Sequence, residues 1–491
     1  MQLSQIMPKL KIVIFYLMLF LILFWISCQA GAAIDNSKLS WVYLFIGLSI
    51  FVMLPYINNK IGSFSLLCGV VFIYWVPLGS GLPILPRLLP RIQITELGMW
   101  MLFVMILIYN IISRNTLRKS TMSRYAFLPF SLFIGGSLIT FLISEKYTDA
   151  SYELTQIRIS VLLPVLICFL CIYFIKTLEQ AKKLLWVFLI SAGLLGLINL
   201  FGPQTTDPSI LLLVTKGSLD IGRIYRVIKL QPFDLLIMNP EVTAVCFAFI
   251  TALSFNLWLN HPSFSRRLLA AVILGISSLV IIKGQGRMGL IAASCSVVVI
   301  TALTLKFRKY PSGLFRKSLP KAVILISAIL GGAWYQASIS PYELTQRRVM
   351  SMFANPLQSE GLDLRIWLWK ESINVFSKHP FGVGFGGFPS FLQISGNAWF
   401  AHNLYLYLVL SVGIIGFIGF LWIFIHYAKI CWAGLHSDVI DRRILCIGGI
   451  GCLTVLFVGG IGSCVYESPW EVLMVWVPIG IIMARATLKD K

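Results

Sequence analysis

Charged residues are scarce in this chain of 491 amino acids: 12% are charged, 58% are hydrophobic, and the mean hydropathy is +0.86. A soluble domain carries about 25% charged residues. This chain has too little polar surface to solvate a globule of its length, so the composition excludes a soluble protein and predicts an integral membrane protein. Lys and Arg number 40 against 19 Asp and Glu, an excess typical of loops beside membrane spans rather than of nucleic-acid binding.

A disulfide framework is also lacking. Most of the ten cysteines, such as Cys246, Cys295 and Cys446, lie inside apolar runs, where cysteine acts as a small hydrophobic residue. Cys168 and Cys171 form a CxxC pair, but the surrounding run LLPVLICFLCIYF is membrane-spanning. We therefore expect no redox or zinc role for this pair.

The apolar runs are long enough, at about 17 to 25 residues each, to cross a bilayer as helices. They predict an all-α polytopic membrane protein with about 12–14 transmembrane helices. The first run also resembles a signal peptide, and we favour an uncleaved helix. The runs begin near residues 11, 40, 62, 97, 125, 159, 183, 243, 267, 288, 321, 402, 443 and 468.

Alternating these spans from a cytoplasmic N-terminus places the basic loops inside: Lys176, Lys182, Lys183, Arg266, Arg267, Arg442 and Arg443. The acidic residues Glu145, Asp149 and Glu153 then fall in an outer loop. Two long loops, about 202–240 and 340–400, are also external, where loops of this length usually carry function. We divide the chain into N-terminal helices (1–200), a catalytic region (201–430) and C-terminal helices (431–491).

Cations in the outer loops oppose the positive-inside pattern. Arg287, in the short hairpin KGQGRMGL, either snorkels or binds an anion at headgroup level. Two carboxylates near outer span ends, Glu241 and Glu471, are expected to pair with nearby cations. The other external cations are Arg223, Arg226, Lys229, Arg347, Arg348, Arg365 and Lys370.

Residues 362–378, LDLRIWLWKESINVFSK, place Ile366, Trp369, Ile373 and Phe376 at helical spacing and predict an amphipathic helix in the outer loop. Its tryptophans suit packing or anchoring. The run GVGFGGF at 382–388 lacks the strand and βαβ unit of a dinucleotide site, and we expect a flexible turn. His402 then stands where the chain re-enters the membrane, as a structural residue or as a general base.

These motifs resemble a known family. RIWLWKESINVFSKHPFGVGFGGF, followed by AHNLYLYLVLSVGIIGFIG, resembles the signature region of the O-antigen ligase and polymerase superfamily. GRMGL at 286–290 is similar to the family's SRG element, and IMNPEVTAV at 237–245 to its NPN element. The resemblance covers about residues 220–420. Gln285-Gly286 departs from the pattern, because a hydroxyl residue usually precedes the arginine.

The resemblance implies a GT-C-like fold with a large periplasmic loop carrying the amphipathic helix, in the cell inner membrane. It implies transfer of a glycan from an undecaprenyl (polyprenyl) pyrophosphate carrier to an acceptor hydroxyl on the periplasmic face. Arg287 and Arg365 would bind the pyrophosphate, and His402 would activate the acceptor. The further candidates for substrate binding are Arg223, Arg226, Arg347, Arg348 and Asn403.

No DxD motif occurs in the sequence, so we expect a metal-independent glycosyltransferase without a cofactor. Its expected partners are the lipid-linked donor, lipid A–core or a growing glycan as acceptor, and membrane lipids, with no nucleic acid. An O-antigen ligase is our leading interpretation. A polymerase that joins repeat units is the alternative, and a polysaccharide transporter or flippase is a third, less favoured because no inverted repeat is visible.

Overall fold

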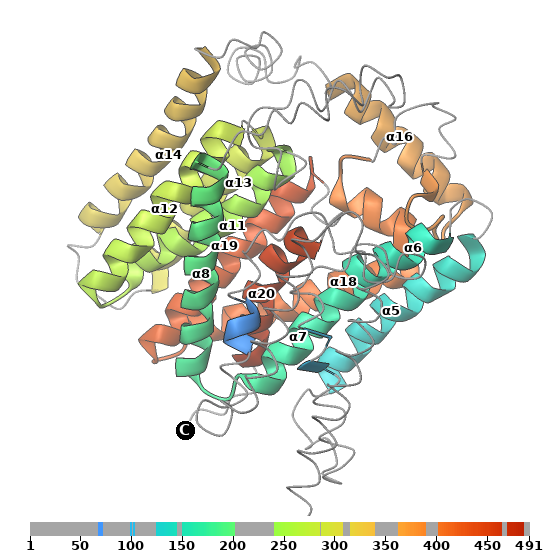
Figure 1. The fold of residues 1–491 in the computed structure, drawn as a ribbon, viewed down its shortest axis with the longest axis horizontal. Coiled ribbons are helices and arrows are strands. Elements are labelled where there is room, and N and C mark those ends of the chain that lie inside the picture. The colour runs from blue at the N-terminus through green and yellow to red at the C-terminus, as the bar shows by residue number, and fades with distance from the viewer. Residues whose placement is uncertain are drawn as a thin grey trace, which may run out of the picture.

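The computed structural model describes residues 67–71, 99–100, 102–103, 124–144, 150–201, 240–284, 286–307, 315–338, 362–388, 401–463 and 469–485. Every regular element in these ranges is helical, and they pack side by side as a bundle (Figure 1). The chain is therefore an all-helical, multi-pass membrane protein, as the sequence predicts. Eight of the described helices are long and apolar enough to cross a membrane.

The first half of the described bundle contains α5 (Arg124–Ser144), α6 (Ala150–Ile157), the π-helical turn η1 (Arg158–Leu162), α7 (Leu163–Phe174) and α8 (Leu178–Phe201). Next come α11 (Pro240–Asn260), α12 (Phe264–Gly284), α13 (Arg287–Phe307) and α14 (Phe315–Ser338). The remainder is α16 (Leu362–Lys378), α18 (Leu404–Leu435), α19 (Ile440–Gly460) and α20 (Pro469–Arg485).

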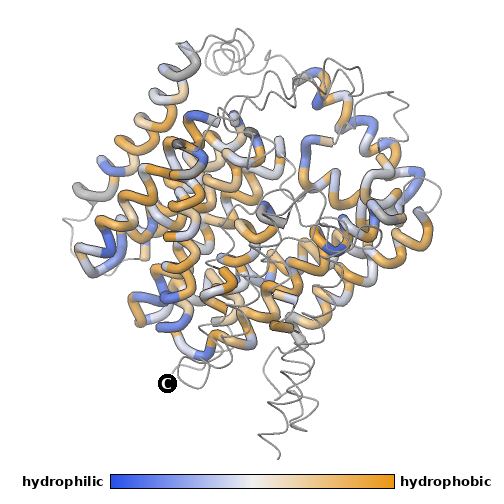
Figure 2. The backbone as a smooth tube through the Cα atoms, in the orientation of Figure 1, coloured by the Kyte–Doolittle hydropathy of each residue, from blue (hydrophilic) through white to orange (hydrophobic). Residues whose placement is uncertain are grey.

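Each predicted span from residue 125 onward corresponds to one of these helices. Two are shorter apolar helices, with apolar stretches at Leu319–Tyr335 and Glu471–Ala484. The spans predicted near residues 11, 40, 62 and 97 lie wholly or mostly outside the described residues, so the total of about 12–14 stays a prediction. Hydrophobic residues run along the middles of the helices and hydrophilic ones gather at their ends (Figure 2), as a bilayer requires.

Helix α18 packs along α5 through glycines, and it ties the predicted N-terminal and catalytic regions together. A Cβ on Gly136 would contact the backbone of Gly416, and one on Gly419 would lie 2.5 Å from the Phe133 nitrogen. Small residues allow such close backbone approach. Gly480 of α20 similarly faces Cys171 of α7, whose Sγ would be 3.0 Å from an added Cβ. Cys171 and Cys168 are free and buried, in keeping with a packing role.

One prediction about the span near residue 159 is wrong. The helical segment begins at Ala150, so Glu153 lies in α6 and not in an exposed acidic loop. Its side chain is buried, and the Ser144 hydroxyl donates a hydrogen bond of 2.6 Å to its Oε2. The helical run continues through the π-turn η1 into α7, which buries a polar stretch that sequence alone places at the surface.

The two ends of the bundle differ in charge. Lys182 lies at one end, where it binds Glu179 (2.6 Å) and Asp441 (2.7 Å). At the same end Arg443 donates to the Phe307 carbonyl at 2.9 Å. These residues come from three connections, α7 to α8, α13 to α14 and α18 to α19, so the structure gathers these connections on one side. The candidate site lies at the opposite end.

Candidate active site

The amphipathic helix α16 has the predicted bounds, and only part of the predicted apolar set lies at its buried face. Leu368, Ser372 and Val375 are buried, whereas Ile366 and Ile373 are exposed. The buried positions follow the i, i+4, i+7 spacing of one helical face. This face packs near the start of α18, with Trp369 and Phe376 partly buried beside it, whereas Ile366 and Ile373 remain available to lipid.

Arg365, in the first turn of α16, forms an ion pair with Glu241, in the first turn of α11. The Arg365 Nη2 lies 2.8 Å from Glu241 Oε2. Both side chains are partly buried. The expectation that Glu241 pairs with a nearby cation is therefore confirmed, and the cation is the arginine predicted to bind pyrophosphate.

The other edge of the Arg365 guanidinium faces the end of α19 and the start of α13. A Cβ on Gly462 would lie 3.1 Å from Arg365 Nη1 and 2.8 Å from the Met288 sulfur. Met288 directly follows Arg287, the first residue of α13. The side chains of Met288 and Arg365 thus both approach Gly462, although these residues are far apart in the sequence.

Gly289 in the same hairpin allows α13 to pack tightly on α11. A Cβ there would lie 2.5 Å from the Ala244 carbonyl carbon and 2.7 Å from its oxygen. Gly289 therefore fits against Ala244, one turn beyond Glu241. This contact holds the start of α13 against the start of α11.

Helix dipoles reinforce the positive charge at this point. The N-termini of α11, α13 and α16 meet around Arg365, Glu241 and Met288. Each helix N-terminus carries a partial positive charge of roughly half a unit and favours anions. With Arg287 and Arg365, this arrangement suits a multiply charged anion, and Glu241 is the carboxylate that the structure places there.

His402 precedes α18 and has left-handed backbone geometry, with φ of +47°. For a residue other than glycine this geometry costs about 1–2 kcal/mol, so neighbouring contacts must maintain it. Asn403 caps the helix: its Oδ1 accepts from the Tyr405 (3.0 Å) and Leu406 (3.1 Å) nitrogens. Its Nδ2 donates to the Ile461 carbonyl at 3.2 Å.

Helix α16 links the Arg365 region to His402. Trp369 lies one turn after Arg365 on the same helical face, and its indole Nε1 donates to the Ala401 carbonyl at 3.0 Å. Ala401 is the residue before His402. The segment at Ile461 and Gly462 connects the same two points, because it contacts both Asn403 and Arg365. The neighbourhoods of Arg287, Arg365 and His402 are thus joined by direct contacts.

The glycine-rich turn at 382–388 is packed, not open, so the expectation of a flexible turn is wrong. Gly382, Gly384 and Gly386 have φ near +80° to +90°, which glycine adopts without strain. Val383 donates to the Leu410 carbonyl at 2.7 Å, and Ile414 to the Pro380 carbonyl at 3.0 Å. These bonds insert the turn into the break of α18 at Gly413, where φ is +67°.

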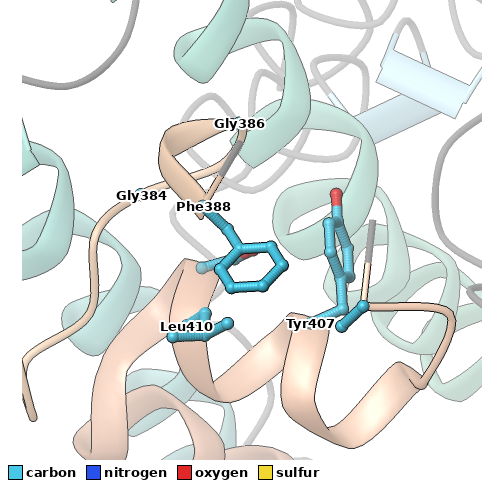
Figure 3. A pocket seen from close by; sticks show the side chains of 7 residues that line it. Gly384, Gly386, Phe388, Tyr407 and Leu410 are labelled. Atoms are coloured by element: carbon cyan, nitrogen blue, oxygen red, sulfur yellow. The ribbon is translucent and has the colours of Figure 1, made fainter. Parts of the chain in front are cut away.

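A cavity of about 10 Å³, enough for roughly one water molecule, lies between this turn and α18. Phe388, Leu410 and Tyr407 border it, as Figure 3 shows. Beneath the turn, a Cβ on Gly384 would contact the buried carboxylate of Glu153. Sequence reasoning missed this residue, because an acidic side chain near a predicted loop is normally solvated.

Four predicted binding residues, Arg223, Arg226, Arg347 and Arg348, lie outside the described residues, as do most of the two long loops. Their roles stay predictions. Within the described residues, no group of three or more His, Cys, Asp or Glu side chains is arranged to hold a metal ion.

Comparison with protein families gives a match over residues 270–421 to the family described as O-antigen ligase. This chain carries an O-antigen ligase family domain. The domain runs from within α12 to the middle of α18 and includes Arg287, Arg365, His402 and the glycine-rich turn. No curated protein matches the chain. The family-matched region thus lies within a multi-pass membrane protein, and the matched family is one of membrane glycan transfer with lipid-linked substrates.

Proposed function

We propose that this protein transfers a glycan from a polyprenyl pyrophosphate carrier to an acceptor hydroxyl at the periplasmic face of the inner membrane. The observation that carries the proposal is the position of Arg365, between the starts of α11 and α13 and one helical turn from the Trp369 contact that leads to His402. An anion site and a candidate base are thereby placed on the same end of the bundle.

In the proposed reaction the acceptor oxygen attacks the anomeric carbon of the donor sugar. The bond from that carbon to the pyrophosphate oxygen breaks, and the polyprenyl pyrophosphate leaves with both bonding electrons. The acceptor proton passes to His402. A glycosidic bond replaces the sugar–phosphate bond, so the step needs neither ATP nor an oxidant.

Arg287 and Arg365 bind the pyrophosphate in this scheme and stabilise the charge that develops on it. Donors preorganised around a developing negative charge are the largest contributors to many enzymatic rates. The N-termini of α11, α13 and α16 add to the same field. Because the cations and helix ends supply this stabilisation, we propose a metal-independent reaction without a cofactor.

Glu241 acts as the resting counterion of Arg365. Donor binding exchanges one anion for another at the guanidinium, since pyrophosphate offers oxygen acceptors that match its planar fork. An ion pair that is partly exposed contributes only about 0–1 kcal/mol, so a bound pyrophosphate with further contacts to helix N-termini displaces it readily.

Asn403 orders the base, because its Oδ1 accepts from two backbone N–H groups and its Nδ2 donates one of its two N–H groups to the Ile461 carbonyl. Its role in substrate binding stays a prediction. Its cap fixes the first turn of α18, and the Trp369 bond fixes the carbonyl of Ala401. These contacts hold His402 in its left-handed conformation from both sides. Strained geometry of this kind gathers at functional sites.

We favour lipid A–core as the acceptor, which makes the protein an O-antigen ligase; a polymerase that extends the glycan is the alternative. Gene deletion separates the two. A ligase deletion leaves long glycan on the polyprenyl carrier while lipid A–core stays bare. A polymerase deletion leaves core with single repeats and no long chains. Normal surface glycolipid and normal carrier-linked glycan in the deletion strain would refute both.

A further inference from the structure

A cavity of about 500 Å³ lies at the opposite end of the bundle, between the starts of α8 and α12 and the short helical segment 67–71, which contributes Cys68. Helices α8 and α12 run side by side in the bundle (Figure 1). Its polar rim contains Lys182, Lys183 and Arg266, together with Glu179. The cavity is far from the candidate active site, because it lies at the connection from α7 to α8, whereas Arg365 contacts the start of α11.

Glycines close the helix pair further into the membrane. A Cβ on Gly193 would lie 3.4 Å from the Ile273 Cγ1, and one on Gly196 would lie 2.5 Å from the Ile276 Cγ2. Between this contact and the basic rim, the walls are apolar: Trp186 is half-buried, and Ile190 and Leu269 are exposed. The cavity therefore has basic residues at its opening, the half-buried Trp186 in its wall, and exposed apolar residues beyond it.

The rim keeps a net positive charge after its internal pairs are counted. Lys182 is neutralised by Glu179 and Asp441, at 2.6 and 2.7 Å. Lys183 and Arg266 are exposed and form no ion pair within the described part of the chain. Burial, and then the charge of Arg266, lower the pKa of His261 from its usual 6.5, so this neighbouring imidazole adds no charge near neutral pH.

We propose that this cavity binds one molecule of an anionic phospholipid. Its phosphate lies between Lys183 and Arg266, and an acyl chain follows Ile190 and Leu269 toward the contact at Gly193. Basic pockets between helices at a membrane surface recognise anionic headgroups, and tryptophan favours the same depth. The cavity lies at the end of the bundle opposite the candidate active site. The proposed lipid binding therefore does not depend on the proposed transfer reaction.

The test is native mass spectrometry of the purified full chain, saturated with phosphatidylglycerol or with phosphatidylcholine. We expect retained phosphatidylglycerol to fall roughly 10- to 30-fold at limiting lipid in the double variant Lys183→Gln, Arg266→Gln, since each surface cation contributes about fivefold. The matched control, Lys176→Gln with Lys429→Gln, removes the same charge from exposed cations outside the cavity and should bind as the wild type does.

Two further measurements distinguish a lipid-binding site from nonspecific electrostatic attraction. Leu269→Trp fills the apolar wall and leaves the cations in place; it should also reduce phosphatidylglycerol binding. Soluble glycerol phosphate at millimolar concentration should not displace the lipid. Equal binding of phosphatidylcholine, equal loss in the control double variant, undiminished binding by Leu269→Trp, or displacement by glycerol phosphate would each overturn the proposal.

Discussion

Arg365 and Glu241 are 124 positions apart in the sequence and form an ion pair of 2.8 Å at the point where three helix N-termini meet. The pair joins the start of α11 to the start of α16, and the helices α12, α13 and α14 lie between them in the sequence. It also gives the proposed anion site a defined state before a donor binds, because the arginine side chain is already held and its charge is already compensated.

Replacing Glu241 with Gln removes this competing anion. We expect the KM for the lipid-linked donor to fall about fivefold, which corresponds to roughly 1 kcal/mol for a partly exposed pair, with little change in kcat. Asp363→Asn is the matched control, because it removes an exposed carboxylate from the first turn of α16, which also contains Arg365. A rise in KM for Glu241→Gln would show that the carboxylate is needed to position Arg365.

Replacing Arg365 with Ala should reduce kcat by about 10²- to 10³-fold, the usual cost of removing one donor from a developing anion. Arg365→Lys keeps the charge but loses the two-pronged geometry, so we expect an intermediate rate. Steady-state kinetics with a polyprenyl pyrophosphate donor measure both. Wild-type rates in Arg365→Ala would remove this residue from the site.

The variant His402→Asn removes the imidazole that would act as a base and preserves the left-handed backbone geometry at this position. Asparagine tolerates the left-handed region, so the variant should fold and retain the contacts of Asn403 and Trp369. Loss of a general base lowers the rate by about 10²- to 10⁴-fold, and donor binding should not change. If His402→Asn turned over at the wild-type rate, the histidine would be purely structural.

Asn403→Ala removes the cap of α18 and the bond to Ile461. The cap alone is worth about 1 kcal/mol, so we expect a lower thermal unfolding temperature in detergent. Asn403→Asp retains the cap and should recover most of that stability. A variant with normal stability but a raised acceptor KM would support direct substrate binding by Asn403 instead.

Gly384→Ala should destabilise the protein, since a Cβ would contact the Glu153 carboxylate and lie 2.7 Å from the Ser144 Oγ. The left-handed backbone adds about 1–2 kcal/mol. Gly275→Ala is the matched control: it lies in α12 with nothing within 4 Å of the added carbon. Equal yields of folded protein from the two variants, measured by gel filtration, would contradict the packed turn.

Sequence patterns located the described helices well, because a membrane span requires a long apolar run. Such a run can be recognised from its own contiguous residues, without knowledge of the rest of the fold. The bounds of α16 followed from helical spacing and from the proline after His379. Contacts between residues that are distant in the sequence were harder to predict. Sequence predicted a cation near Glu241 but could not identify Arg365, since that contact depends on how α11 and α16 meet.

Burial was the main source of error. Ile366 and Ile373 have the right spacing for a buried face, yet Leu368 and Val375 are the residues that pack. Glu153 reads as a loop carboxylate, and only the continuous run from α6 into the π-turn buries it. The glycines at 382–388 resemble a flexible segment, but their positive φ values serve a tight fit into α18.

The most direct test is transfer by the purified protein in lipid nanodiscs, with a glycan-loaded polyprenyl pyrophosphate and lipid A–core. Mass spectrometry would measure glycosylated acceptor and free polyprenyl pyrophosphate together. We predict that the two appear in equal amounts without added metal, and that Arg365→Ala and His402→Asn each lower the rate of both by about 10²-fold or more. Unchanged formation of both products in these variants would contradict a shared site built around Arg365 and His402.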